Sequence, residues 1–159
     1  MKIEFILPVE PKTKKNSPMF SWRKRPYNIK IGRKIVWTIP YTPFIVPSKG
    51  YNEFENEVLP FLNRVKAETG CINYPCNVKA LFWVKVRRNY DLTNCNEALH
   101  DAMVKAGLLV DDNRDFIGGT DGSRVFYDKL NPRIEVTITQ MDDYVQWKPT
   151  NIEQKGLFQ

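Results

Sequence analysis

Residues 77–112 read NVKALFWVKVRRNYDLTNCNEALHDAMVKAGLLVDD, and the change of period within this stretch decides the fold. Alternation over residues 77–87 places valine, alanine and phenylalanine side chains on one face, which predicts a β-strand. From residue 94 to 105 the apolar side chains instead recur at helical spacing, and Gly107 is suited to end that helix. A short apolar run then leads into two aspartates. A strand, a crossing helix and a second extended segment predict an α+β arrangement.

The flanking sequence supplies the other elements of a single domain, residues 1–141, with a mixed sheet packed against two main helices. Ser48 is suited to cap a helix that runs to Gly70, in which Pro60 is expected to cause a kink or a split. Residues 142–159 lack periodicity and are expected to form a C-terminal tail. Three further strands are predicted, at residues 2–7, 116–127 and 133–139.

Positive charge is concentrated in residues 11–49, which contain ten Lys or Arg and no Asp or Glu; since the whole chain carries +6, the remainder carries −4. Most of this stretch belongs to a predicted basic hairpin arm, residues 17–46, whose strands 27–31 and 34–38 flank a glycine-containing turn. Interleaved aromatic residues suit contact with a phosphate backbone and stacking on exposed bases, whereas a solubilising surface hairpin is the alternative. The candidate DNA-binding residues are Lys12, Lys14, Lys15, Arg23, Lys24, Arg25, Lys30, Arg33 and Lys34.

Other sequence features restrict the class of protein. No apolar run approaches the roughly 20 residues needed to cross a bilayer, so a membrane protein is not expected. The N-terminus lacks the layout of a signal peptide, and the three cysteines lack the spacing of a zinc site or a disulfide framework. We therefore expect a cytoplasmic protein with reduced thiols.

Six carboxylates lie within 25 residues, in and around the predicted helix 94–105. Hydrolysis of a phosphodiester needs an activated water and charge neutralisation at phosphorus, and carboxylate-bound Mg²⁺ supplies both. A return crossover predicts that the acids before and after the helix meet at one edge of the sheet, although each acid could instead be a helix cap or a solvated group. His100 is expected at the surface or the core edge, and Cys95 in the core. The six acids are Asp91, Glu97, Asp101, Asp111, Asp112 and Asp115.

These acids resemble the motif of the RusA family of Holliday junction resolvases, in which D-x-D-N opens a helix and a D-D pair comes after it. The resemblance implies that Asp91 and Asp112 bind the metal and that Asn94 is the matched asparagine. Thr93 stands in place of the second acid and Glu97 in place of a functional lysine, so we expect Glu97 to replace the missing ligand. Supporting roles are expected for Asp111 and Asp101. The residues that carry the resemblance are Asp91-Leu92-Thr93-Asn94, Glu97, Asp101-Ala102, Lys105-Ala106-Gly107 and Asp111-Asp112.

The resemblance also implies an activity, namely that of a homodimeric endodeoxyribonuclease that uses Mg²⁺ or Mn²⁺ to cut four-way junction DNA. Its setting would be recombination, repair or phage DNA processing in the cytoplasm of a bacterial or phage-infected cell. Leu81 and Trp83, on the outer face of the strand 77–87, are candidate dimer contacts. Two alternatives remain open: a catalytically silent protein that binds branched DNA, and a basic structural protein that assembles on nucleic acid.

Overall fold

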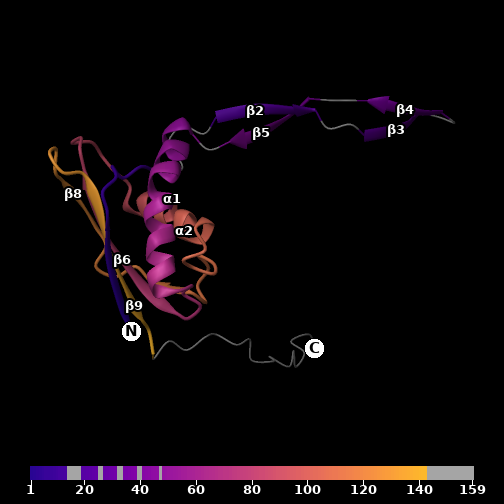
Figure 1. Cartoon of the computed structure of the whole chain (residues 1–159). Coiled ribbons are helices and arrows are strands. Elements are labelled where there is room, and N and C mark those ends of the chain that lie inside the picture. Colours follow the sequence, from indigo (N-terminus) through magenta and orange to yellow (C-terminus); the bar gives the residue numbers. More distant parts are fainter. Residues whose placement is uncertain (14–18, 25–26, 32–33, 39–40, 47, 143–159) are drawn as a thin grey trace, which may run out of the picture.

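A computed structural model describes residues 1–13, 19–24, 27–31, 34–38, 41–46 and 48–142. It shows an α+β fold in which helices α1 (Lys49–Thr69) and α2 (Leu92–Lys105) cover one face of a five-stranded mixed sheet (Figure 1). The predicted fold class is therefore confirmed. Within these described residues no helix combines the length and the apolar character that a membrane span requires.

The central strand of the sheet is β6 (Cys76–Val84). On one side it pairs antiparallel with β9 (Arg133–Gln140), which pairs antiparallel with β1 (Lys2–Leu7). On the other side it pairs parallel with β7 (Ile117–Gly119) and β8 (Arg124–Tyr127). Helix α2 is the crossover between β6 and its parallel neighbours, and the carboxyl ends of β6 and β8 consequently lie together.

The prediction of one strand over residues 116–127 was wrong, because side chains replace the backbone ladder between β7 and β8. The Ser123 hydroxyl accepts from the Ala80 N–H at 3.0 Å, and the Asn77 side chain bonds the Asp121 backbone N–H at 2.7 Å and C=O at 3.2 Å. A Cβ on Gly119 would lie 2.9 Å from Asn77 Oδ1. The glycine thus permits the close approach that ends β7.

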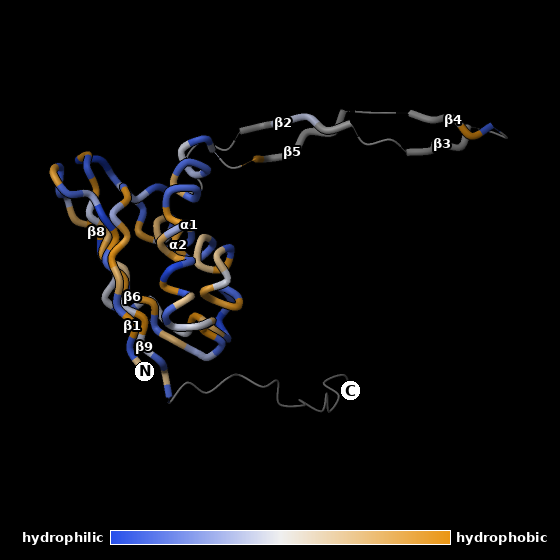
Figure 2. The backbone as a smooth tube through the Cα atoms, viewed as in Figure 1, coloured by the Kyte–Doolittle hydropathy of each residue, from blue (hydrophilic) through white to orange (hydrophobic). Residues whose placement is uncertain are grey.

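The core lies between the sheet and the two helices, where Figure 2 shows hydrophobic colour on β6, β9, α1 and α2. Every second residue of β6 from Cys76 to Val84 is buried, and β9 alternates in the same way from Ile134 to Ile138. The predicted apolar stripe of α2 is buried throughout and consists of Cys95, Ala98, Leu99, Ala102, Met103 and Ala106. Helix α1 contributes Tyr51, Phe54, Val58 and Leu62.

Helix α1 begins and ends as its sequence predicts. The Ser48 hydroxyl accepts from the Tyr51 N–H at 3.2 Å, and Gly70 closes the helix with a φ of +80°. The predicted split at Pro60 was wrong, because one helix continues through it. Pro60 lies on the exposed side, so the carbonyl deprived of a helical partner faces water.

The connection between β6 and α2 is longer than the sequence indicates. Strand β6 ends at Val84 and not at residue 87, and Val86 is 52 % exposed. Helix α2 starts at Leu92 with Asp91 as its N-cap, two residues before the predicted start. Asp91 is therefore positioned by the helix and not by the end of a strand.

The predicted arm contains two antiparallel strand pairs, β2 (Met19–Lys24) with β5 (Tyr41–Val46) and β3 (Tyr27–Ile31) with β4 (Lys34–Thr38). The hairpin strands 27–31 and 34–38 are confirmed, and their turn lies outside the described residues. The two pairs follow one another as a narrow ribbon that leaves the domain near the start of α1 (Figure 1). Nearly all of the expected tail, residues 143–159, also lies outside the described part.

Candidate functional site

Asp91 caps the N-terminus of α2. Its Oδ1 accepts from the backbone N–H groups of Thr93 at 2.9 Å and Asn94 at 3.4 Å, and its Oδ2 accepts from Asn94 Nδ2 at 3.0 Å. The cap satisfies helix donors that lack an intrahelical partner and places a negative charge at the positive end of the helix dipole. Asn94, the matched asparagine, therefore orients Asp91. Lone pairs remain on the carboxylate, since it offers about four acceptor positions.

A second group of acids consists of Asp101 on α2 and Asp111 and Asp112 in the loop that follows the helix. The pKa of Asp112 is raised above its ordinary value by partial burial, by the charge of Asp101 and by a hydrogen bond with Asp111. Asp111 Oδ1 also accepts from the Asp112 backbone N–H at 2.8 Å, and its Oδ2 accepts from Asn113 Nδ2 at 2.7 Å. Asp111 thereby fixes the loop, and three carboxylates come together around Asp112.

The start of this loop is anchored to the segment that leads into β6. Leu109 forms a parallel bridge with Ile72, whose N–H bonds the Leu108 carbonyl at 2.8 Å and whose carbonyl accepts from the Val110 N–H at 3.2 Å. Leu108 and Leu109 are buried. Packing of these leucines therefore places the two aspartates that come directly after Val110.

The structure separates the predicted acids into two groups. Asp91 is associated with Thr93 and Asn94, whereas Asp101 comes ten residues later on α2, about 15 Å along the helix axis at 1.5 Å per residue. Asp91 is not among the charges that shift the pKa of Asp112. No set of three or more His, Cys, Asp or Glu side chains within the described ranges is arranged to hold a metal ion.

Glu97 lies on α2 between these groups. It is three residues after Asn94 and four before Asp101, so the three side chains share one face of the helix. Glu97 is half-buried and its charge, like that of Asp101, acts on the imidazole of His100. Its position is compatible with the proposed exchange of roles with Thr93, which remains a prediction.

His100 is buried and not at the surface, with 8 % of its side chain exposed. Burial lowers its pKa to about 4, although Asp101 and Glu97 favour the charged form. The imidazole is therefore neutral at pH 7. Cys95 is buried as expected, and burial raises the pKa of its thiol to about 11, which makes it a core residue.

Helix α1 also contributes polar groups near Asp101. Burial raises the pKa of Tyr51, and the charges of Asp101 and Glu55 act in the same direction. The Tyr51 hydroxyl donates to Glu55 Oε1 at 3.5 Å, and Glu55 also forms an ion pair with Lys105 of α2. Asp101 therefore faces the polar contact between the two helices as well as Asp112.

The predicted DNA-binding residues are described only in part. Lys12 forms an ion pair with Glu10, with 2.7 Å between Nζ and Oε2, so part of its charge is already compensated. Lys34 is exposed at the start of β4, and Arg23, Lys24 and Lys30 belong to strands β2 and β3. The remaining candidates, Lys14, Lys15, Arg25 and Arg33, lie outside the described residues.

One cluster of basic and aromatic residues was not predicted. Arg87 lies over the ring of Tyr127, and Arg88 over the ring of Tyr90, with 4.5 Å from Cζ to the ring centroid in each pair. The run Lys85-Val86-Arg87-Arg88 in the sequence was a usable signal, but alternation assigned it to a strand. Tyr127 is 40 residues from Arg87, and only the parallel pairing of β6 and β8 brings them together.

Neither a comparison with models of protein families nor a search among curated proteins gives a match for this chain.

Proposed function

We propose that this protein is a metal-dependent endodeoxyribonuclease that cuts branched DNA, with the four-way junction as its substrate. The observation that carries the proposal is that Asp101 and Asp111 lie close enough to Asp112 to raise its pKa, in addition to the larger effect of desolvation. Like-charged carboxylates repel one another, and a bound cation relieves that repulsion. The resemblance of the acid motif to the RusA family supports the substrate class.

The donor set fits a hard divalent cation such as Mg²⁺ or Mn²⁺. Mg²⁺ is commonly bound through one or two carboxylates, with water and substrate phosphate as the other ligands, so a cage of three protein side chains is not required. Asp112 with Asp101 or Asp111 meets this need, and Glu97 is a proposed further ligand from α2. Asp91, ten residues before Asp101, would hold a separate cation at the start of the helix. The cation would neutralise phosphate charge and lower the pKa of an attacking water.

The protein's other residues have proposed roles in holding DNA. Lys12 and the basic residues of the arm contact phosphates, and Lys34 is an exposed example. A two-fold dimer presents two acid groups to the two strands that are cut in a junction. In this proposal the arm binds DNA and the acids cut it, so that separate residues perform the two tasks.

Cleavage of a four-way junction, compared with a linear duplex of the same sequence, tests the proposal in Mg²⁺, in Mn²⁺ and in EDTA. We expect metal-dependent cutting of the junction alone. Asp112→Asn should lower the rate about 100-fold or more, because loss even of groups that only support metal ligands costs 10–100-fold. Asp121→Asn is the matched control, since Asp121 is exposed on the β7–β8 turn and should leave the rate unchanged.

The other outcomes identify the alternatives. Tight junction binding without cleavage in either metal would show a catalytically silent branched-DNA-binding protein. Equal binding to junction and duplex, again without cleavage, would indicate a structural protein that assembles on nucleic acid. Full activity of Asp112→Asn would refute the site assignment.

A further inference from the structure

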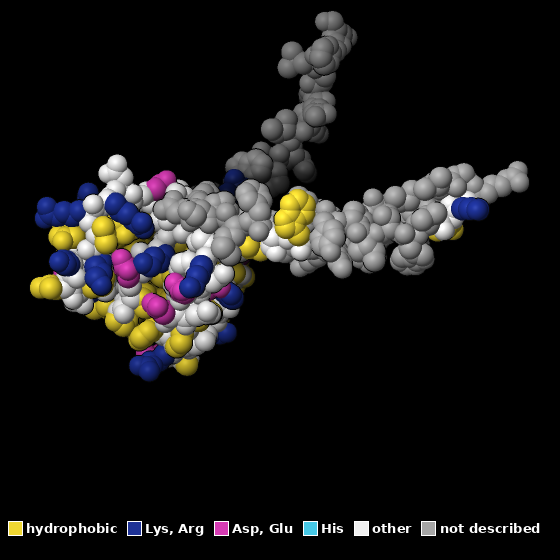
Figure 3. Space-filling view, turned by 90° about the horizontal axis from the view of Figure 1, so that it is seen from above, with side chains coloured by type: hydrophobic (Ala, Val, Ile, Leu, Met, Phe, Trp, Pro, Cys, Tyr) yellow, Lys and Arg dark blue, Asp and Glu magenta, His cyan; other side chains and the backbone are white. Residues whose placement is uncertain are grey.

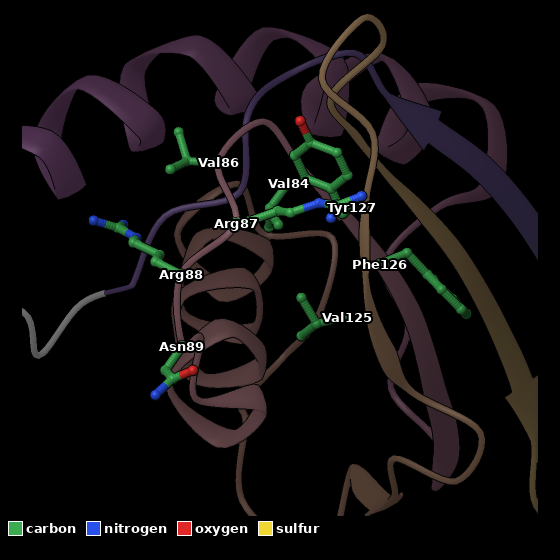
Figure 4. Close-up of a pocket in the computed structure, with 8 residues that line it drawn as sticks. All are labelled: Val84, Val86, Arg87, Arg88, Asn89, Val125, Phe126 and Tyr127. Carbon is green, nitrogen blue, oxygen red and sulfur yellow. The ribbon is translucent and has the colours of Figure 1, made fainter.

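A groove of about 450 Å³ lies at the carboxyl ends of the parallel strands β6 and β8 (Figure 4), and Asp101, Asp111 and Asp112 are not among the residues that line it. Its apolar part comes from Val84 of β6 and Val125 of β8, and its polar part from the loop that follows β6. Pockets of several hundred Å³ are of the size that accommodates small ligands. The residues that matter most to its chemistry are Arg87, Arg88 and Tyr127.

The groove presents a flat cationic and aromatic surface. Figure 4 shows Arg87 and Tyr127 against each other at its centre, and the Arg87 Cζ lies 4.5 Å from the ring centroid. Tyr127 is still 42 % exposed, so the contact with Arg87 leaves part of the ring open to solvent. A cation–π contact fixes the guanidinium without neutralising its charge.

The second feature of this region is its exposed positive charge. Lys85, Arg87 and Arg88 are exposed, and none of them takes part in an ion pair within the described residues. Asp128, which directly follows Tyr127, is bonded instead to Arg133 at 3.1 Å and to two backbone N–H groups of its own turn. Figure 3 shows Lys and Arg gathered with hydrophobic side chains at the end of the molecule opposite the ribbon.

We propose that this groove binds one unpaired nucleotide of a DNA strand, with the base stacked on the Arg87–Tyr127 pair and a phosphate contacted by Arg88. Every base offers a π-face that can stack on an aromatic ring or a guanidinium plane, and arginine forms strong hydrogen bonds with phosphate. The inference deepens the proposed function, because a branch point or a single-stranded end supplies nucleotides without a paired neighbour. Binding at the groove requires no metal.

The test measures binding by the full chain in EDTA, with fluorescence anisotropy of a labelled thymidine oligonucleotide and an abasic oligonucleotide of equal length. Tyr127→Leu should weaken binding of the thymidine strand about 5-fold or more and leave the abasic strand unaffected, because one stacked base is lost. Tyr127→Phe keeps the ring and should bind as the parent does. This second variant separates loss of stacking from loss of folding.

The phosphate contact is tested by salt dependence. Arg88→Ala should reduce the slope of log affinity against log salt by about 0.7 for both oligonucleotides, as expected for one contact with a single strand. Arg64→Ala removes the same charge from the exposed side of α1 and should change neither slope nor affinity beyond experimental error.

Equal affinities of Tyr127→Leu and parent for the thymidine strand would overturn this inference, as would an effect of Arg64→Ala as large as that of Arg88→Ala. The result is independent of cutting. If the protein binds as described but never cleaves DNA, the groove proposal is supported and the proposed function is refuted. If the protein cleaves junctions but Tyr127→Leu binds like the parent, the proposed function is supported and the groove proposal is refuted.

Discussion

The carboxyl group of Asp112 lies near those of Asp101 and Asp111. Its pKa is raised by burial, by Asp101 and by Asp111, so the ionised form is less stable in the folded chain than in the unfolded chain. As pH rises through this range the unfolded state loses its proton first, and the contribution of Asp112 to folding becomes unfavourable. A bound cation would reverse this effect.

The first prediction concerns that pKa. Asp101→Asn removes one of the neighbouring charges and should lower the pKa of Asp112 toward its ordinary value, because less repulsion then opposes ionisation. Mg²⁺ should lower it in the parent protein. Carboxyl ¹³C NMR titration of the parent and the variant measures both effects. A pKa that responds to neither change would show that the two acids do not share a site.

The second prediction concerns Glu97 and Thr93. Glu97→Gln should reduce junction cleavage severely at limiting Mg²⁺, because ligand charge governs the affinity for the ion. Adding Thr93→Asp in that background should restore part of the rate, since the new carboxylate occupies the position that the resembled family uses. Cleavage rates over a Mg²⁺ series distinguish weaker metal binding from a slower chemical step. Parental activity of Glu97→Gln would make Glu97 a residue of the helix surface only.

Sequence alone could not distinguish a capping role of Asp91 from the proposed metal-binding role. A carboxylate before a helix satisfies the N-cap, and the same residue type in the same place suits a metal ligand. The motif indicated that Asp91 is a metal ligand. In the structure Asp91 caps α2 by accepting two backbone hydrogen bonds, and it accepts a third from the Asn94 side chain. The grouping of Asp112 with Asp101 and Asp111 depended on the path of residues 106–112, which no local pattern fixes.

Helix α2 was predictable because its apolar residues are strictly periodic. The third prediction concerns the cap of this helix. Asp91→Ala should lower the free energy of unfolding by about 1 kcal/mol through loss of the cap. Asp91→Asn preserves the capping geometry and should cost less, yet it should abolish junction cleavage if the carboxylate also binds metal. Urea unfolding together with cleavage assays separates the two roles. An Asp91→Asn protein that cuts normally would leave Asp91 with the cap alone.

Strand ends were less predictable than helices. The alternation of polar and apolar residues continues from Val84 through Arg87. Strands β8 and β9 do not extend alongside these residues, because the last partners of β6 are Tyr127 of β8 and Arg133 of β9. A strand without a partner has no ladder to continue. The division between β7 and β8 was equally hidden, since it depends on how Ser123 and Asn77 bond to distant backbone groups.

At the scale of the whole molecule, no described helix covers the face of the sheet opposite α1 and α2. Trp83 on this face stacks on Phe126 with ring centroids 4.6 Å apart, and Arg133 lies 4.3 Å above the Trp83 ring. The sequence thus predicted correctly that the outer face is partly covered. Ile6 and Leu81 lie in one cross-strand row on either side of Glu135, and Ile6 is 59 % exposed.

The fourth prediction is that two copies associate through this open face as a two-fold dimer. Ile6→Glu should convert the dimer to a monomer, because it places a charge in an apolar contact, and should hardly affect folding at so exposed a position. Sedimentation equilibrium of parent and variant measures the change, with Asn63→Glu on the exposed side of α1 as the control. A parent that is monomeric while it cuts junctions in paired fashion would contradict the dimer.

The pairing of β1 with β9 affects how the molecule is completed during synthesis. Among the described strands β1 pairs with β9 alone, and the Gln140 N–H bonds the Met1 carbonyl at 3.0 Å. Strand β1 therefore cannot pair until residues 133–140 have been synthesised. Until residues 133–140 are released, β6 has an unpaired edge that another nascent chain can occupy. Closure of this sheet is consequently limited by the entropy of bringing together two segments that are far apart in the sequence.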